Sequence, residues 1–404
     1  MGEAMGNVGV ESTRVRQITI GCARNEGEFR QLEPYWNALV MGSNRPSPFL
    51  MYDWSSAWWR HIAKGEELFV LVASDGDEIV GIAPLCIRTD RLFGLDVRTV
   101  EFLGARHVSP DYMDFITIPE RRTEIVSALA LALVSRRDEW DVVSFKDVAQ
   151  VSIAPDALVE ALAPHHIPVF KSVDARCPYM EVPESWAALL RNYSAKRRSF
   201  LRKKRARLES EFHTQFVTVE SPADVPAHIR VLAQLHSSSM VRRHQRSPLE
   251  DECVRPFQNE VALRMAENNC FYGARLECNG IPVSANFGFR LKDHFFYYQT
   301  GFATRLSQYS VGTVLLALTI QDLLERLRIA EFDFLEGPEQ YKYDWTEQER
   351  KTWCVRCFNR TTAGTLMLHS YTASSWLSAQ KRRMQEQASS LVRDFHRRMS
   401  CLVS

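Results

Sequence analysis

Two stretches of the chain place β-favouring apolar runs on either side of a short polar turn. Residues 68–73 and 79–88 flank Ser-Asp-Gly-Asp, and residues 270–277 and 281–290 flank Cys-Asn-Gly. Apolar runs around an Asp-Gly or Asn-Gly turn are typical of β-hairpins. Because the second pattern repeats the first about 200 residues later, we predict that the chain contains two similar halves.

Each predicted hairpin is followed by a helical pattern and then by another strand-like run. Apolar residues recur at intervals of three and four over residues 121–137 and 310–328, which predicts two amphipathic helices. Strands are expected directly afterwards, at 140–145 and 330–335. The order hairpin, helix and strand therefore occurs twice. This repetition predicts an α+β fold with two tandem domains, each with a mixed central sheet flanked by helices.

The two halves are separated by a further helical pattern. An apolar stripe at helical spacing spans residues 183–212, so we place the domain boundary near residue 182. The predicted domains therefore cover residues 1–182 and 183–362, and a helical tail covers residues 363–404.

The second domain is expected to contain additional elements around its hairpin. Helices are predicted at 224–239 and 256–268, and a strand at 352–360 is expected to complete the second sheet. The tail that follows is basic. Its positive charges are Lys381, Arg382, Arg383, Arg393, Arg397 and Arg398.

Composition excludes several classes of protein. The 404 residues are 45% apolar and 25% charged, which is ordinary globular usage and excludes fibrous and disordered chains. The nine cysteines are odd in number and scattered, and no signal peptide precedes them, so we expect reduced thiols and a cytoplasmic location. The longest apolar runs end near ten residues, well short of the roughly 20 that a membrane span needs.

Charge narrows the choice of partners. The chain carries 50 basic and 49 acidic side chains, a balance that argues against general affinity for nucleic acid. Peripheral contact with a membrane through the basic tail remains open, because clustered positive charge can attract an anionic surface even when net charge is small.

Three tracts of the second half occur in a recognisable order: residues 192–209, residues 309–316, and residues 332–337 followed by Tyr341 and Lys342. This order resembles GNAT-superfamily acyltransferases of the CelD-like group, which is associated with cellulose and exopolysaccharide synthesis. The resemblance covers about residues 185–345 and is looser over the first half. Two GNAT-like domains side by side also occur in Fem-type aminoacyl transferases.

The resemblance implies an enzyme that moves an acyl group, most simply acetyl, from acyl-CoA to an amine or hydroxyl acceptor. It implies acyl-CoA as the co-substrate and no metal. Two alternatives stay open. One is a Fem-like aminoacyl transferase, and the other is a non-catalytic accessory protein of a polysaccharide machinery.

In GNAT enzymes the pyrophosphate of CoA lies at the N-terminus of a helix, where free amides and the helix dipole favour an anion. The resemblance places this site at the start of the helix predicted over 310–328. Ser310 is expected to cap that helix, and Gly312 permits close backbone approach. The alternative is an ordinary helix start. The residues assigned to the donor here are Gln308, Ser310, Val311, Gly312 and Thr313.

Residues 191–207 hold nine Lys or Arg side chains and no acidic one. Arg197 and Lys204 fall where the apolar stripe would continue, so some positive charge must face inward or toward a cleft. Such groups need carboxylate or phosphate partners, because unpaired burial of a charge is expensive. The pattern predicts a phosphate clamp formed by Arg197, Arg198 and Arg202. The alternative is a solvated basic helix face.

The strand predicted at 330–335 alternates, so Phe332 and Phe334 share one face and Asp333 lies on the other. The resemblance places this strand beside the acyl-transfer cleft. Asp333 and Glu336 are therefore candidates for the general base that takes a proton from the acceptor. The alternative is that Asp333 pins a loop or pairs with Lys342.

An aromatic segment around Lys342 completes the candidate catalytic set. It resembles the aromatic-Lys segment of Fem-type transferases, which implies that Lys342 stabilises the oxyanion or binds a substrate phosphate. Tyr341 or Tyr343 is then the candidate that protonates the leaving thiolate. His236, with Arg242, Arg243 and His244, matches a His-plus-basic cluster of the CelD-like group. Core packing is the alternative for both.

Overall fold

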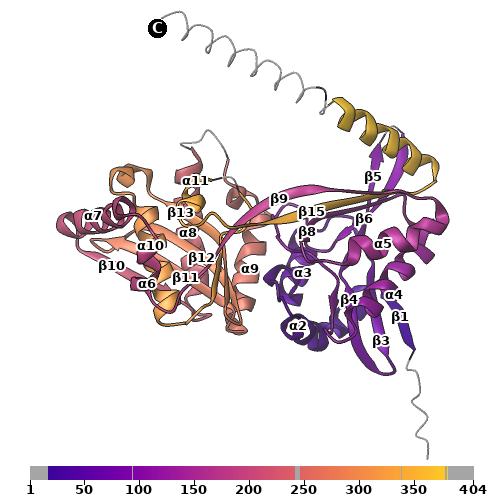
Figure 1. The fold of residues 1–404 in the computed structure, drawn as a ribbon, viewed down its shortest axis with the longest axis horizontal. Helices are drawn as coiled ribbons and strands as arrows, with labels where there is room; N and C mark the ends of the chain where they lie inside the picture. The colour runs from indigo at the N-terminus through magenta and orange to yellow at the C-terminus, as the bar shows by residue number, and fades with distance from the viewer. Residues whose placement is uncertain (1–16, 93, 242–245, 338, 378–379, 381–404) are drawn as a thin grey trace, which may run out of the picture.

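The computed structural model describes residues 17–377 and 380, except 93, 242–245 and 338. Two lobes lie side by side, and two long strands run from one lobe to the other (Figure 1). The basic cluster predicted from Lys381 onward lies outside the described residues. So do Arg242, Arg243 and His244.

The first half contributes most of the right-hand lobe of Figure 1. Its elements are β1 (Ile18–Ala23), α1 (Glu26–Gln31), α2 (Glu33–Gly42), α3 (Tyr52–His61), β2 (Glu67–Leu68), β3 (Val70–Asp75), β4 (Glu78–Ala83), β5 (Leu85–Leu92), β6 (Leu95–Phe102), β7 (Ile116–Thr117), α4 (Arg122–Ser135), β8 (Val142–Ala149), α5 (Ala154–Leu162) and β9 (Val169–Glu181).

The second half contributes the left-hand lobe. Its elements are α6 (Trp186–Arg191), α7 (Ala195–Glu211), β10 (Thr214–Val219), α8 (Val225–Val241), α9 (Val254–Glu267), β11 (Phe271–Cys278), β12 (Ile281–Leu291), β13 (His294–Phe302), the 3₁₀ segment η5 (Thr304–Tyr309), α10 (Val311–Glu325), β14 (Glu331–Asp333), α11 (Gln340–Tyr343) and β15 (Glu349–Phe358).

Both predicted hairpins are confirmed, because β3 pairs with β4 and β11 pairs with β12, each antiparallel. The helices predicted around α4, α8, α9 and α10 are confirmed as well. The run predicted over 79–88 is divided at Pro84, and β4 and β5 enter different sheets. Proline has no amide proton to donate to a strand ladder, which is why the strand breaks there.

Most strands form a single mixed sheet of eleven strands, in the order β10-β11-β12-β13-β14-β9-β15-β8-β6-β5-β2. The predicted strand at 352–360 does not complete a separate second sheet. It belongs to β15, which lies between β9 and β8 and so joins the two halves. The expectation was wrong because pairing between residues nearly 200 positions apart leaves no local signal in the sequence.

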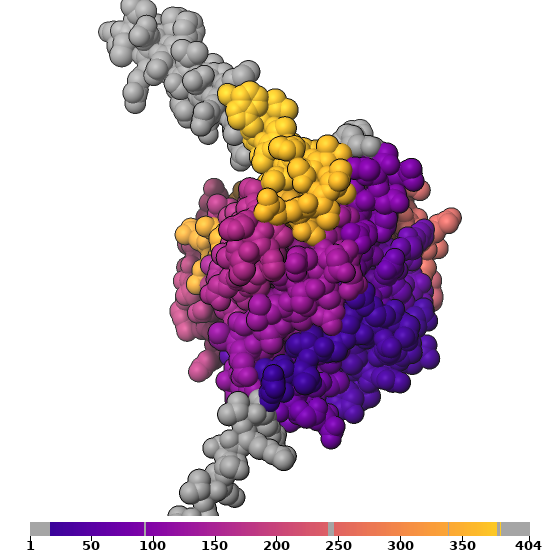
Figure 2. Space-filling view, turned by 90° about the vertical axis from the view of Figure 1, so that its right-hand side faces the viewer, coloured from indigo at the N-terminus to yellow at the C-terminus, as the bar shows by residue number. Residues whose placement is uncertain are grey.

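The tail begins as predicted, with a helix over 362–377. Phe358 and Ala363 form a small apolar cluster with Val97 and Val142, and Met367, Leu368 and Tyr371 pack against it. Figure 2 shows this helix lying on the surface of the first half. Its apolar side therefore anchors it to the sheet formed by β6, β8 and β15.

An aromatic cluster packs at the contact between the two halves. Trp54, on α3, is fully buried and its ring lies 5.0 Å from Phe257 and 5.5 Å from Tyr298 of the second half. Its indole N–H donates to the carbonyl of Gly104 at 3.0 Å. Aromatic pairs at these spacings contribute beyond the area that they bury.

We predict that Trp54→Ala lowers the free energy of unfolding by about 3–5 kcal/mol, because it opens a cavity and leaves the Gly104 carbonyl unpaired. Equilibrium urea unfolding would measure the loss. Trp376→Ala is the matched control, since Trp376 is 62% exposed and its removal should change stability by less than about 0.5 kcal/mol. Similar losses in both variants would contradict the assignment.

Candidate functional site

A cleft of about 550 Å³ opens where β13 and β14 separate. The two strands are parallel neighbours over only three residue pairs, from His294 with Glu331 to Phe296 with Asp333. Beyond Phe296, the edge of β13 that faced β14 has no strand partner among the described residues, and Tyr298 is bulged out of register with β12. Such a bulge redirects the backbone and leaves polar groups facing the opening.

The cleft collects most of the predicted site residues. They come from α7, α8, the start of α10, the loop after β14 and α11: Arg197, His236, Ser310, Val311, Gly312, Thr313, Glu336, Tyr341 and Lys342. Four predicted residues do not line it: Gln308, Asp333, Arg198 and Arg202.

The start of α10 differs from the expectation in one respect. Ser310 has a left-handed backbone with φ of 55°, and its side chain makes no capping hydrogen bond, so the predicted cap is wrong. The amides of the first helical turn have no intrahelical acceptor. Val311, Gly312 and Thr313 line the cleft, so these amides make the helix start a ready anion site.

The basic helix α7 divides its charges between the cleft and the solvent. Arg198 and Arg202 are exposed, and Arg198 donates to the carbonyl of Tyr193 at 2.6 Å. Lys204 donates to the carbonyl of Gln308 at 2.7 Å, next to the start of α10. Arg197 alone of the three predicted clamp residues lines the cleft.

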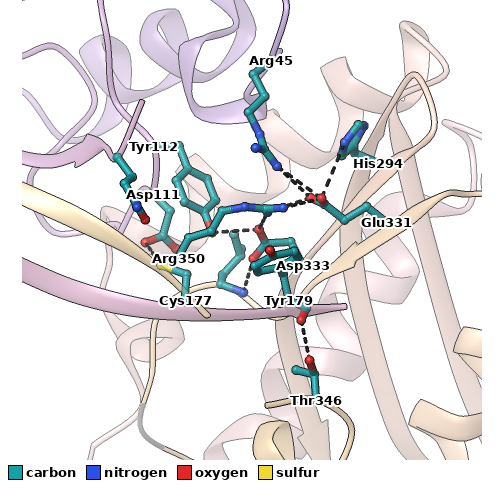
Figure 3. Close-up of polar contacts among 12 residues, drawn as sticks. Arg45, Asp111, Tyr112, Cys177, Tyr179, His294, Glu331, Asp333, Thr346 and Arg350 are labelled. Carbon is teal, nitrogen blue, oxygen red and sulfur yellow. Dashed lines mark hydrogen bonds and ion pairs between the residues drawn. The ribbon is translucent and has the colours of Figure 1, made fainter. Parts of the chain in front are cut away.

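Asp333 is fully buried, and Figure 3 shows its carboxylate next to Tyr112 and Arg350. Its carboxylate accepts from Tyr112 Oη at 2.7 Å, from Arg350 Nη1 at 2.9 Å and from the amide of Leu335 at 2.8 Å. Burial raises the pKa of Asp333 to about 6, although Arg350 opposes that shift. Asp333 pins the loop that follows β14 and makes no pair with Lys342 within the described residues.

Arg350 holds this buried cluster together. Besides Asp333, it binds Glu331, and its guanidinium lies 3.4 Å from the centre of the Tyr179 ring. Arg45 also binds Glu331, at 3.2 Å. The cluster thus joins β14, β15 and the first half, which is why no local motif marked Arg350.

Asp111 is the cleft residue that the sequence pattern missed as a functional group. It lines the cleft, is 2% exposed, and accepts from the amide of Glu336 at 3.0 Å and from Cys177 Sγ at 3.3 Å. Burial is the main cause that raises its pKa to about 7, and the nearby Asp333 adds to it. A carboxyl with a pKa near neutrality is suited to accept protons.

Two further carboxyls lie beside Asp111. Oxygens of Asp111, Asp147 and Glu336 fall within 4.8 Å of one another. Desolvation raises the pKa of Asp147 to about 8 and also raises that of Glu336, so protons occupy part of this cluster at neutral pH. The donor set could hold a divalent cation only in its fully ionised form, and we assign none.

Lys342 lines the cleft but holds its own loop. Its Nζ donates to the carbonyls of Leu335 at 3.2 Å and Glu336 at 2.5 Å, and lies 3.2 Å from Glu339 Oε2. Two of these contacts are hydrogen bonds, and both accept at backbone carbonyls of the loop after β14. Lys342 therefore fixes that loop, and its role at an oxyanion stays a prediction.

His236 and Tyr341 complete the lining. His236 Nδ1 lies 2.7 Å from Ser247 Oγ and is half-buried on α8. Tyr341, on α11, is partly exposed and also lines the cleft. The cleft is therefore brought together from both halves, with Asp111 from the first and every other named lining residue from the second.

Comparisons with known proteins agree with this geometry. Residues 195–343 match the family model of the acetyltransferase (GNAT) domain. These residues include α7, β13, α10 and β14. The predicted GNAT resemblance is confirmed for that domain, and the CelD-like grouping stays a prediction. Comparison with curated protein sequences finds no match.

Solved structures share the fold of nearly the whole chain. A crystal structure of FemX is 9% identical, with a TM-score of 0.56, and the match covers 80% of this chain and 95% of FemX. The C-terminal domain of a proposed lysylphosphatidylglycerol synthetase from Agrobacterium fabrum is 11% identical, with a TM-score of 0.50, covering 85% and 96%. Identities this low show the fold alone, and the predicted fold class is confirmed.

Among the described residues, every helix is too short or too polar to cross a bilayer.

The raised pKa of Asp111 predicts how stability depends on pH. Between about pH 4 and pH 7 the folded protein keeps a proton that the unfolded chain has lost, so this carboxyl lowers stability as pH rises through that window. At pH 8 the loss reaches at most about 4 kcal/mol. Asp111→Asn should remove this contribution and leave those of Asp333 and Asp147, so the loss of stability becomes smaller.

Urea unfolding at pH 5 and pH 8 would measure the change in both proteins. Glu160→Gln, an exposed carboxyl on α5, is the control and should leave the wild-type slope in place. An Asp111→Asn protein that loses as much stability as the wild type between the two pH values would refute the assignment.

Proposed function

We propose that this protein transfers an acyl group from acyl-CoA to an amine or hydroxyl acceptor, with Asp111 as the general base. One observation carries the proposal. A buried carboxyl whose pKa is raised to about 7 lies in the same cleft as an uncapped helix start. The first can take a proton and the second can hold an anion.

The donor fits the open edge of β13. Its pyrophosphate would bind the amides of Val311, Gly312 and Thr313, where helix dipole and free N–H groups favour negative charge. Its pantetheine arm would extend along β13 toward Tyr298, where the strand has lost its neighbour. The cleft volume of about 550 Å³ is within the range of small-molecule sites.

The acyl group would pass directly to the acceptor. The acceptor's lone pair forms a bond to the acyl carbon, and its N–H or O–H proton passes to Asp111. The C–S bond then breaks and releases the CoA thiolate, to which Tyr341 can return a proton. Backbone N–H groups at the unpaired edge of β13 would stabilise the oxyanion, and no covalent enzyme intermediate forms.

The identity of the acyl group, the biosynthetic role and the location are proposed from the sequence resemblance. We propose acetyl as the acyl group, a link to polysaccharide or cell-envelope biosynthesis, and a cytoplasmic location, where acyl-CoA and reduced thiols coexist. Fem-like aminoacyl transfer and a non-catalytic accessory role are the alternatives. A protein that binds neither acetyl-CoA nor free CoA would favour them.

Asp111→Asn is expected to lower kcat by about 10²- to 10⁴-fold, since it removes the base and leaves the shape of the cleft unchanged. In the wild type, kcat/KM should rise with pH and reach half its plateau near pH 7, where Asp111 ionises. Steady-state kinetics with acetyl-CoA and a panel of amines and alcohols would measure both. An Asn variant with the wild-type pH profile would remove Asp111 from the reaction.

Gly312→Leu should weaken acetyl-CoA binding at least about tenfold, a loss near 1.4 kcal/mol. A Cβ at this position would lie 3.3 Å from Phe302 Cδ1, and a larger side chain would cover the amides at the helix start. Thermal shift would show it, because ligand at 100 times Kd stabilises the wild type by about 2.7 kcal/mol.

Gly42→Leu is the matched control for this experiment. Gly42 lies at the end of α2 with open space around it, so the change should leave donor binding intact. Equal donor affinity in the Gly312 variant and the wild type would count against the proposed donor site.

A further inference from the structure

Arg197 is held in one orientation at the wall of the cleft. Its Nη1 donates to Asp344 Oδ2 at 3.1 Å. Its guanidinium carbon lies 5.1 Å from the centre of the Trp345 ring and 5.6 Å from that of Phe200. The side chain is only 16% exposed. A salt bridge at one nitrogen and aromatic rings nearby therefore fix the position of the guanidinium.

The other edge of the same guanidinium makes no hydrogen bond within the described part of the chain. Nε and Nη2 are both buried, and neither has a hydrogen-bond acceptor among the residues that the structure describes. These two nitrogens share one edge of the planar group, so their N–H bonds point in the same direction. That edge matches the two oxygens of a carboxylate or phosphate, which Arg binds bidentately.

Leaving this edge unpaired is costly. A buried donor without an acceptor loses its hydration and gains nothing in return, and the cost is larger for a charged group. Arg197 lines the cleft, so a ligand bound in the cleft would lie beside this guanidinium.

We infer that Arg197 binds an oxyanion of a substrate side-on, through Nε and Nη2. This is a second anion subsite, separate from the start of α10. Lys204 contacts the carbonyl of Gln308, next to that helix start, and Arg197 lies seven residues earlier on α7. At 1.5 Å per residue, Arg197 and Lys204 are about 10 Å apart along the helix.

The free Nε and Nη2 edge of Arg197 indicates that the bound group is an oxyanion. Two different molecules could carry that oxyanion. One source is the 3′-phosphate of the CoA donor, and the other is an acidic group of the acceptor. The choice between them rests on the proposed function, because that function places acyl-CoA in the cleft. The binding of an oxyanion by Arg197 does not rest on it.

Arg197→Lys is the decisive variant, because it keeps the positive charge and removes the bidentate edge. Arg202→Lys is the matched control on the same helix, since Arg202 is exposed and does not line the cleft. Arg197→Gln provides a second reading if the Lys variant fails to fold, as judged by circular dichroism. The probes are CoA, 3′-dephospho-CoA, sodium phosphate and succinate, measured by isothermal titration calorimetry.

If the oxyanion belongs to the donor, the wild type should bind CoA about 10- to 100-fold more tightly than dephospho-CoA, and Arg197→Lys should abolish that difference. If it belongs to the acceptor, both CoA forms should bind equally. Phosphate or succinate should then bind to the CoA-saturated wild type and bind at least about tenfold more weakly to the Lys variant. Both results support the subsite.

The inference is overturned if Arg197→Lys and Arg197→Gln bind every probe as the wild type does, or if Arg202→Lys loses as much affinity as they do. Absence of CoA binding in the wild type, with phosphate or succinate binding still dependent on Arg197, would reject the proposed function and leave the subsite standing. The two failures are therefore distinguishable.

Discussion

The cleft depends on one buried interaction, the carboxylate of Asp333 held by Arg350 and Tyr112. The same carboxylate accepts from the amide of Leu335, whose backbone has a left-handed φ of 59°. Because the chain turns there, β14 ends after three residues while β13 continues. The two strands separate, and the gap between them becomes the cleft. An anionic side chain thus sets where the sheet opens.

This interaction also shapes the electrostatics of the opening. Removing Asp333 and Arg350 from water is expensive, and such a pair often contributes little net stability. Its contribution here is to fix the position of neighbouring residues and to place a negative charge near the cleft. Tyr112 carries the contact across to the first half, and its neighbour Asp111 lies on the cleft side of the wall. The negative charge of Asp333 adds to the burial that raises the pKa of Asp111. A structural ion pair and a candidate catalytic base are therefore coupled.

The sequence predicted those features of this arrangement that depend on residues close together in the chain. Hairpins, amphipathic helices and the alternation around Asp333 follow from periodicity, and the break in the apolar stripe at Arg197 correctly required a charged partner, which is Asp344. The pairing of β9 with β15 and the approach of Asp111 to Glu336 were not predictable. Asp111 and Glu336 are 225 positions apart, and only the assembled sheet brings them together.

Two cavities of the molecule differ in how their cations are paired. A second cavity of about 580 Å³ lies between the halves and is lined by Arg45 and Arg122 of the first half and by Arg350 of the second. Each of these guanidinium groups binds a carboxylate of the chain itself. In the cleft beside α10, Arg197 keeps a buried edge unpaired, and the side chain of Ser310 makes no capping hydrogen bond. A folded chain satisfies its buried donors wherever it can. Donors left unpaired beside an open cleft are therefore the groups to which a ligand can add hydrogen bonds.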